Sequence, residues 1–238
     1  MAEKSATSNQ RLVTVETEPK SLEVDLQRTA VMIIDMQNCF VNKGGMFDLW
    51  GLDITPCQRI IDPIKKIASV ARSSGVRVIY TVHQYSPDLR EGGGPDSPMW
   101  YKASTITDIR EHPEWRDKLQ IRGTWGAEIV EQLKPREDDI VIEKQRYSAF
   151  YQTNLDSILK TYDIKYLIFT GLATNICVEA SIRDAFYIGY FPILIPDACA
   201  NVGPAYTQDA AVYNVILCYG WVATSENIMR ALERTAHV

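Results

Sequence analysis

The chain has 238 residues, a length that fits one α/β domain with a sizeable buried core. Hydrophobic residues make up 46% and charged residues 23%, an ordinary globular composition that excludes a chain disordered as a whole. The net charge is −5 at pH 7 and no run of Lys and Arg is present, so a basic face that binds nucleic acid is not expected.

Five short apolar runs, rich in β-branched and aromatic residues, predict strands at residues 29–35, 76–82, 139–144, 166–171 and 191–197. They are apolar throughout instead of alternating, which is typical of a parallel sheet covered on both faces. Segments with helical periodicity follow these strands, at residues 57–73, 125–134, 153–162, 177–189, 205–218 and 225–234. The alternation predicts an α/β fold: a three-layer α/β/α sandwich with a mostly parallel, doubly wound sheet. We expect residues 1–24 to be a polar N-terminal extension and residues 25–238 to be a single domain.

The segment 83–124 interrupts this alternation, because no clear helix is predicted between its ends. A loop of this length inside a compact domain is usually functional. It begins at the carboxyl end of a predicted strand, where open α/β sheets bind their ligands. We therefore expect it to form a lid and one wall of a pocket, with a surface insertion or an oligomer contact as the alternative.

The cysteines are Cys39, Cys57, Cys177, Cys199 and Cys218, an odd number without CxxC or other metal-binding spacing. Such a set is typical of reduced thiols in a cytoplasmic protein. The first residues contain no apolar segment of a secretory signal, and no apolar run approaches the ~20 residues that cross a bilayer. We expect a cytoplasmic protein with neither membrane nor nucleic acid among its partners.

Three reactive residues lie at or just beyond strand carboxyl ends, where a parallel sheet would bring them together. Asp35 ends the first strand, Lys144 ends the third, and Cys177 follows the fourth through a turn and opens a helix. Each alone has a plainer interpretation, as a turn former, a solvated cation or a core residue. Together they indicate acyl transfer without a metal.

The chemistry of the three residues is complementary. A thiol at a helix N-terminus and near a cation has a lowered pKa, and Lys144 is the candidate cation. Asp35 is the candidate acid and base, accepting the thiol proton and returning it to a leaving amine. Backbone N–H groups in the turn before the helix would face the developing oxyanion.

Four motifs carry a resemblance to a known family. They are D-x-Q at Asp35 and Gln37, R-G-T-W-G at 122–126, K-x-x-x-S-A-F from Lys144 to Phe150, and GLATNICVEASIRDAF at 171–186. On these motifs the chain resembles the isochorismatase-like cysteine hydrolases, from about residue 29 to residue 233. The resemblance implies their hydrolase fold and a catalytic triad of Asp35, Lys144 and Cys177. It also implies an oxyanion hole from the N–H groups of Ala173 and Cys177, a cis peptide bond between Ala173 and Thr174, and a homo-oligomer.

Within that family, several segments look like those of the ureidoacrylate amidohydrolases of pyrimidine degradation. These segments are GGMFDLWG (44–51), GGPDSP (93–98), RYSAFYQTNLDSIL (146–159) and ATNICVEASIRDAFYIGYF (173–191). The segment VHQYSPDL (82–89) is more similar to biuret hydrolases, and His83 and Tyr85 stand where Asn and Trp are expected. The alternatives of biuret, an N-carbamoyl amino acid or another small amide therefore remain open.

We expect hydrolysis of the C–N bond of a small, carboxylated ureido or carbamoyl compound through a covalent thiocarbamate. The alternative from another class is an inactive binding or scaffold protein with this fold. Candidate substrate-binding residues, for which packing or solvation is the alternative, are Gln37, His83, Tyr85, Glu91, Trp100, Tyr101 and Tyr147. The three histidines at 83, 112 and 237 show no metal-ligand spacing, so we expect no metal and no other cofactor. Tyr213, Tyr219 and Trp221 are candidates for either a subunit interface or the core.

Overall fold

The computed structural model describes residues 10–233 and gives them two β-sheets. The larger sheet has six parallel strands in the order β5-β4-β3-β6-β7-β8, and β1 and β2 form a separate antiparallel pair. The strands are β1 (Leu12–Val15), β2 (Leu22–Asp25), β3 (Thr29–Ile34), β4 (Arg77–His83), β5 (Ile140–Lys144), β6 (Tyr166–Leu172), β7 (Phe191–Ala200) and β8 (Trp221–Val222). All five predicted strands are present.

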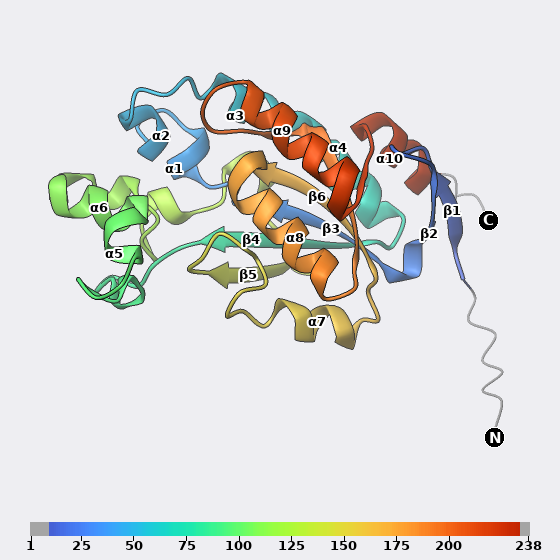
Figure 1. Ribbon diagram of the computed structural model, residues 1–238, viewed down its shortest axis with the longest axis horizontal. Coiled ribbons are helices and arrows are strands. Elements are labelled where there is room, and N and C mark those ends of the chain that lie inside the picture. Colours follow the sequence, from blue (N-terminus) through green and yellow to red (C-terminus); the bar gives the residue numbers. More distant parts are fainter. Residues whose placement is uncertain (1–9, 234–238) are drawn as a thin grey trace.

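Helices cover both faces of the large sheet (Figure 1). They are α1 (Asn38–Val41), α2 (Met46–Leu49), α3 (Thr55–Arg59), α4 (Ile61–Ser73), α5 (Met99–Lys102), α6 (Ser104–Glu111), α7 (Leu155–Thr161), α8 (Glu179–Tyr187), α9 (Tyr206–Asn214) and α10 (Ser225–Glu233). Within residues 10–233, no helix has both the length and the apolar character needed to cross a membrane.

Strand β3 shows how the two cores form. Every one of its residues is buried, and successive side chains point to opposite faces. Val31 and Ile33 join a core with α4 and α10, whereas Met32 and Ile34 join a core with α7 and α8. The predicted three-layer sandwich with a parallel, doubly wound sheet is therefore confirmed.

The predicted helix at 125–134 is wrong. Residues 125–127 and 131–133 form two isolated 3-10 turns, and Ile129 between them pairs with Gln37 as an antiparallel bridge. The apolar side chains of this segment are spaced like those of a helix, but its backbone bonds to the segment after β3 instead of closing helical turns.

The segment 1–24 is not only a polar extension. Val13 and Val15 of β1, with Val24 of β2, are buried in the core beside α4 and α10. Burial alternates along β1 because one face of this hairpin is exposed to solvent. This alternation gives the segment as a whole its polar composition. The folded domain therefore includes the hairpin, and residues 1–9 lie outside the described residues.

The lid segment 83–124 has structure of its own, contrary to the expectation of a long loop. It contains α5, α6 and the 3-10 helix Pro113–Lys118. Tyr85, Ala103 and Ile106 form a small hydrophobic core within it. The segment lies beyond the carboxyl ends of β4 and β5, where Figure 1 shows α5 and α6 at the arrowheads of these strands.

Gly171, the first residue of the longest motif, allows β6 to approach β3 beside Asp35. Its φ is +104°, and a Cβ atom at this position would lie 2.1 Å from the carbonyl oxygen of Ile34. Any larger residue would push the two strands apart at their carboxyl ends. The motif glycine therefore sets the spacing on which the site depends.

Candidate active site

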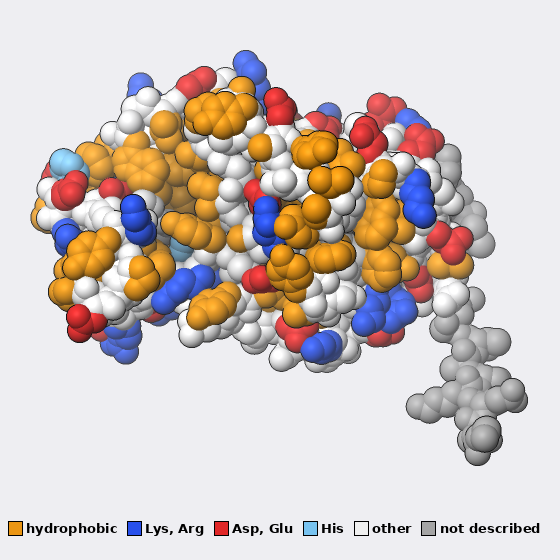
Figure 2. Space-filling view, viewed as in Figure 1, with side chains coloured by type: hydrophobic (Ala, Val, Ile, Leu, Met, Phe, Trp, Pro, Cys, Tyr) orange, Lys and Arg blue, Asp and Glu red, His pale blue; other side chains and the backbone are white. Residues whose placement is uncertain are grey.

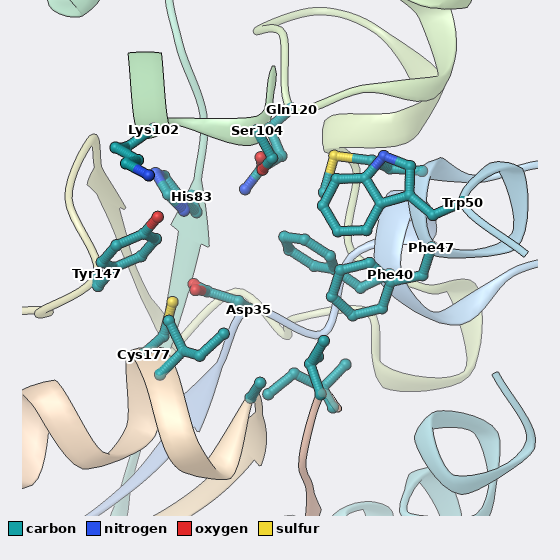
Figure 3. A pocket seen from close by; sticks show the side chains of 15 residues that line it. Asp35, Phe40, Phe47, Trp50, His83, Lys102, Ser104, Gln120, Tyr147 and Cys177 are labelled. Carbon is teal, nitrogen blue, oxygen red and sulfur yellow. The ribbon is translucent and has the colours of Figure 1, made fainter. Parts of the chain in front are cut away.

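The three predicted catalytic residues come together at the carboxyl edge of the large sheet. Asp35 follows β3, Lys144 ends β5, and Cys177 follows β6. Strand order reverses between β3 and β6, and open α/β sheets have their ligand crevice at such a point. The Lys144 ammonium lies 2.6 Å from Asp35 Oδ2, and the Cys177 sulfur faces the Asp35 carboxylate (Figure 3).

Asp35 is held in place through both its backbone and its side chain. Its φ is 51°, a left-handed conformation that Asp adopts more readily than most residues. The Asp35 N–H donates to the Thr81 carbonyl at 3.2 Å, and the Thr81 hydroxyl donates to Asp35 Oδ1 at 2.7 Å. With Lys144 beside Oδ2, both carboxylate oxygens have a fixed partner.

Lys144 is fully buried, and its charge is stabilised by the groups around it. Burial by itself would lower the pKa of this ammonium, but the charge of Asp35 and the neighbouring Cys177 sulfur favour the ammonium, and the pKa is raised overall. Lys144 Nζ also donates to the Arg146 carbonyl at 3.1 Å. The ammonium is therefore charged and fixed.

The Cys177 thiol is not in the state that the sequence predicts. The pKa of this thiol is raised to about 12: burial, the largest cause, and the charge of Asp35 raise it, and together they outweigh the charge of Lys144, which lowers it. Cys177 lies within a π-helical turn, Thr174–Val178, and not at the open end of α8. The stable form at neutral pH is therefore the thiol, and a base must take its proton when the substrate is attacked.

A cis peptide bond lies between Leu172 and Ala173, one bond before the predicted position at Ala173 and Thr174. The Ala173 carbonyl accepts hydrogen bonds from the N–H groups of Ile176, at 3.0 Å, and Val178, at 3.1 Å. The peptide after Ala173 therefore already belongs to the helical turn. The bond that redirects the chain from β6 into this turn is the preceding one.

The predicted oxyanion donors, Ala173 and Cys177, both border the pocket. The Ala173 carbonyl accepts from Ile176 and Val178 but not from the intervening Cys177. Within residues 10–233 the Ala173 N–H donates no hydrogen bond. The backbone thus brings two candidate donors to the side of the nucleophile.

A pocket of about 230 Å³ opens beside these residues. One wall is aromatic and consists of Phe40, Phe47 and Trp50. The lid supplies another wall, with Lys102, Ser104 and Gln120. Figure 3 shows these lid residues across the pocket from Asp35 and Cys177. The volume suits a small substrate.

His83 is a predicted substrate-binding residue that lies beside the reactive groups. It lines the pocket at 4% exposure, and one of its ring nitrogens is within 4.8 Å of the candidate ligand atoms of Asp35 and Cys177. Burial and the charge of Lys144 hold the pKa of His83 well below its usual range, so the ring is neutral. His83 Nε2 has no hydrogen-bond partner among residues 10–233, whereas the ring bonds the backbone of Gln145. Nδ1 therefore carries the proton, and Nε2 is a free acceptor.

Tyr147 is the other predicted substrate-binding residue on the pocket wall. Gln37 was also predicted to bind the substrate, but it does not line the pocket. The Gln37 amide nitrogen donates to the carbonyls of His83, at 3.1 Å, and Ala127, at 2.9 Å. Its oxygen accepts from the His83 N–H at 2.8 Å. Gln37 is thus saturated with backbone partners, and it positions His83 instead of binding a ligand.

The remaining four predictions do not fall on the pocket wall. Tyr85 is buried in the lid core. Glu91 accepts hydrogen bonds from the N–H and hydroxyl of Ser86. Trp100 packs beneath Arg110, and Tyr101 is 58% exposed. These side chains build the lid, and the sequence did not separate residues that support the lid from those on its inner surface.

The structure adds pocket residues that were not predicted. The aromatic wall comes mainly from α1 and α2, and the motif GGMFDLWG contains Phe47 and Trp50. That motif was the available signal for the wall. No sequence signal distinguished Lys102 from other exposed lysines.

One group of side chains within residues 10–233 is close enough to share a metal ion: Asp35, His83 and Cys177. The prediction of a metal-free site considered the spacing of histidines in the sequence and did not foresee this approach. A metal ion would have to compete with Lys144 for Asp35 and displace the proton of Cys177. These residues are better suited to a protonated Cys177 beside the ion pair of Asp35 and Lys144 than to a bound metal ion. Metal independence stays a prediction.

Comparison with known proteins places these residues in a family. A protein-family model described as "Isochorismatase domain" matches residues 29–227 of this chain. A ureidoacrylate amidohydrolase RutB of Agrobacterium fabrum is 41% identical over 226 residues, covering 95% of this chain and 99% of that protein. The protein of the same name from Caulobacter segnis is 42% identical, over 87% of each chain.

Solved structures agree with the sequence relatives. A cysteine hydrolase from Pseudomonas syringae pv. phaseolicola has a TM-score of 0.76 at 27% identity, covering 96% of this chain and 100% of that one. An N-carbamoylsarcosine amidase from Thermoplasma acidophilum has a TM-score of 0.62 at 27% identity, covering 84% and 97%. The chain belongs to the isochorismatase family, and the resemblance inferred from its motifs is confirmed.

Proposed function

We propose that this protein is a cysteine amidohydrolase that cleaves the C–N bond of a small ureido compound, with ureidoacrylate as the best-supported substrate. The observation that carries the proposal is a buried thiol facing an Asp–Lys ion pair in a small pocket. Relatives about 40% identical over most of the chain are named ureidoacrylate amidohydrolases, which supports the substrate class. The N-carbamoylsarcosine amidase has a carbamoyl compound in its name as well.

In the proposed reaction, Asp35 takes the proton of Cys177 as the sulfur attacks the carbamoyl carbon. The N–H groups of Ala173 and Cys177 hold the oxyanion. Asp35 then gives its proton to the nitrogen of the leaving aminoacrylate as the C–N bond breaks. A thiocarbamate remains on Cys177, and water cleaves it to carbamate, which decomposes to ammonia and carbon dioxide. Lys144 holds the Asp35 carboxylate in place through their ion pair.

His83 has a role in this scheme that its chemistry supports. A ureido group carries N–H donors on both sides of the carbonyl that is attacked. The free acceptor at His83 Nε2 is buried at the pocket wall, so we propose that it accepts one of these N–H groups. The bond would orient the carbamoyl carbon toward the sulfur.

Substituting His83→Phe is expected to lower kcat/KM for ureidoacrylate by roughly tenfold to a hundredfold, because an unpaired buried N–H costs ~1–3 kcal/mol. His83→Asn retains an acceptor and should recover most of the loss. Steady-state ammonia release by the three proteins is the measurement. Equal kcat/KM for wild type and His83→Phe would remove His83 from substrate binding.

A substrate panel tests the proposed function. We expect the wild-type protein, assayed with a chelator present, to release ammonia from ureidoacrylate faster than from biuret, N-carbamoyl amino acids, nicotinamide or simple aliphatic amides. Turnover of plain amides alone would remove the ureido class. A folded protein that turns over none of them would favour the binding-protein alternative, and loss of activity with chelator would contradict metal independence.

We further propose that the protein is a cytoplasmic homo-oligomer. Phe186 and Tyr187 of α8 and Tyr219 of the π-helical turn Val215–Tyr219, which follows α9, form a cluster of mutually contacting rings. Tyr213 of α9 is exposed, which decides against a core role for it. Figure 2 shows hydrophobic side chains gathered over α8 and α9. Exposed apolar patches of this kind mark interaction surfaces. Sedimentation should show an oligomer, and a wild-type monomer would contradict this.

A further inference from the structure

The charge of the pocket wall is unbalanced. Asp35 and Lys102 are the charged side chains among the lining residues, and the neutral His83 adds no charge. The charge of Asp35 is neutralised by Lys144 at 2.6 Å. The Lys102 ammonium has no ion-pair or hydrogen-bond partner within residues 10–233. The pocket therefore presents one uncompensated positive charge, and it lies on the lid.

Gln120 places a fixed hydrogen-bond donor on the same wall. Its side chain is 2% exposed and lines the pocket. The Thr105 hydroxyl accepts from the Gln120 backbone N–H at 3.4 Å and donates to Gln120 Oε1 at 2.7 Å. The bond to Oε1 orients the side-chain amide of Gln120, so its Nε2 group remains available as a hydrogen-bond donor. Within the described part of the chain, Nε2 has no acceptor.

The position of Gln120 is set by the lid itself. Its carbonyl accepts from the Tyr85 N–H at 2.8 Å, which fastens the segment to the end of β4. Lys102 is the last residue of α5, and Ser104, whose side chain also lines the pocket, begins α6. A cation, an amide donor and a hydroxyl thus come from one folded lid.

We propose that Lys102 and Gln120 form the site that binds the carboxylate of the substrate. A cation and a fixed N–H donor on the same pocket wall can both bind a carboxylate, and hydrogen bonds to ionised groups are the stronger ones. The reactive groups lie on the opposite side of the pocket (Figure 3). The substrate would then bridge the lid and the sheet, with its carbamoyl group at Cys177 and its carboxylate at Lys102.

This assignment narrows the substrate class. The aromatic wall of Phe40, Phe47 and Trp50 borders the space between the two ends and suits a flat, conjugated chain. Biuret and nicotinamide carry no carboxylate and would leave Lys102 and the Gln120 amide unpaired. The assignment rests on the proposed function and favours an anionic ureido compound over a neutral one.

The test compares ureidoacrylate with its methyl ester, which keeps the ureido group but lacks the charge. In Lys102→Met, the ratio of kcat/KM for the acid to that for the ester should fall at least roughly tenfold, or ~1.4 kcal/mol, mainly through KM for the acid. Gln120→Glu is isosteric and keeps the bond from Thr105, but places a negative charge against the carboxylate. It should lower the same ratio.

Lys66→Met is the matched control, since Lys66 is an exposed lysine on α4 and does not line the pocket. The control should leave the ratio unchanged. An equal loss on both substrates, or no loss, in Lys102→Met would overturn the carboxylate site while leaving the amidohydrolase intact. If wild type cleaves neither compound, the proposed function fails, and the carboxylate site fails with it. That outcome is distinguishable because the wild-type protein alone reveals it.

Discussion

Replacing Cys177 by Ala is expected to lower the rate of ammonia release from ureidoacrylate by roughly 10⁴-fold or more, the scale seen when a covalent nucleophile is removed. The substitution removes the sulfur that faces Asp35 and leaves the ion pair of Asp35 with Lys144 in place. Steady-state kinetics on folded protein measures the loss, and circular dichroism checks the fold.

Cys218→Ala is the control for this prediction, because Cys218 is an exposed cysteine that does not line the pocket. It should retain the wild-type rate. Activity in Cys177→Ala within tenfold of wild type would mean that water, and not the thiol, attacks the substrate. Asp35 would then be a base for water, and the covalent intermediate would have to be abandoned.

Replacing Lys144 by Met is expected to lower the free energy of unfolding by ~3–5 kcal/mol, because it leaves the Asp35 carboxylate buried without its cation. Lys144 and Asp35 are 0% and 1% exposed, and their charged atoms are 2.6 Å apart. Turnover should be lost as well, since Lys144 holds Asp35 Oδ2 at 2.6 Å and its removal releases the carboxylate from that position. Urea denaturation and ammonia release measure the two effects.

A matched control separates burial from distance. Lys160 lies 2.6 Å from Asp156, the same distance, but its side chain is 68% exposed. Lys160→Met should therefore cost less than ~1 kcal/mol. The double variant Asp35→Asn with Lys144→Met should regain much of the lost stability and no activity. If Lys144→Met is as stable as wild type, the ion pair contributes little to stability and its role in fixing Asp35 is wrong.

The strands of the large sheet and the positions of the triad residues at their ends could be predicted from the sequence. Uniformly apolar runs mark strands of a parallel sheet, and such strands end at one edge, so Asp35, Lys144 and Cys177 were expected at the same edge of the sheet. The order of the strands was not in the sequence pattern. The hairpin formed by β1 and β2 was not in the sequence pattern either. Buried and exposed residues alternate along β1, and this alternation gives the segment a polar composition.

The pocket wall was harder to predict, for a physical reason. Whether a lid residue faces the substrate depends on how the lid packs on itself. Tyr85 is buried in the small hydrophobic core of the lid, whereas Gln120 lies on its inner surface and lines the pocket. The pKa of Cys177 was predicted in the wrong direction for a similar reason. Proximity to a cation can be read from the strand ends, but burial, the largest cause of the raised pKa, depends on the packed structure.

The measurement that tests the central claim most directly is the fate of labelled carbamoyl carbon in a single turnover. Excess enzyme is mixed with ureidoacrylate labelled at that carbon, quenched in acid at successive times, digested and analysed by mass spectrometry. We predict that the label appears transiently on the peptide containing Cys177 and then leaves as carbamate, with none on the peptide containing Cys218. Aminoacrylate formed at the full rate, with no label on Cys177 at any time, would contradict covalent catalysis by this thiol.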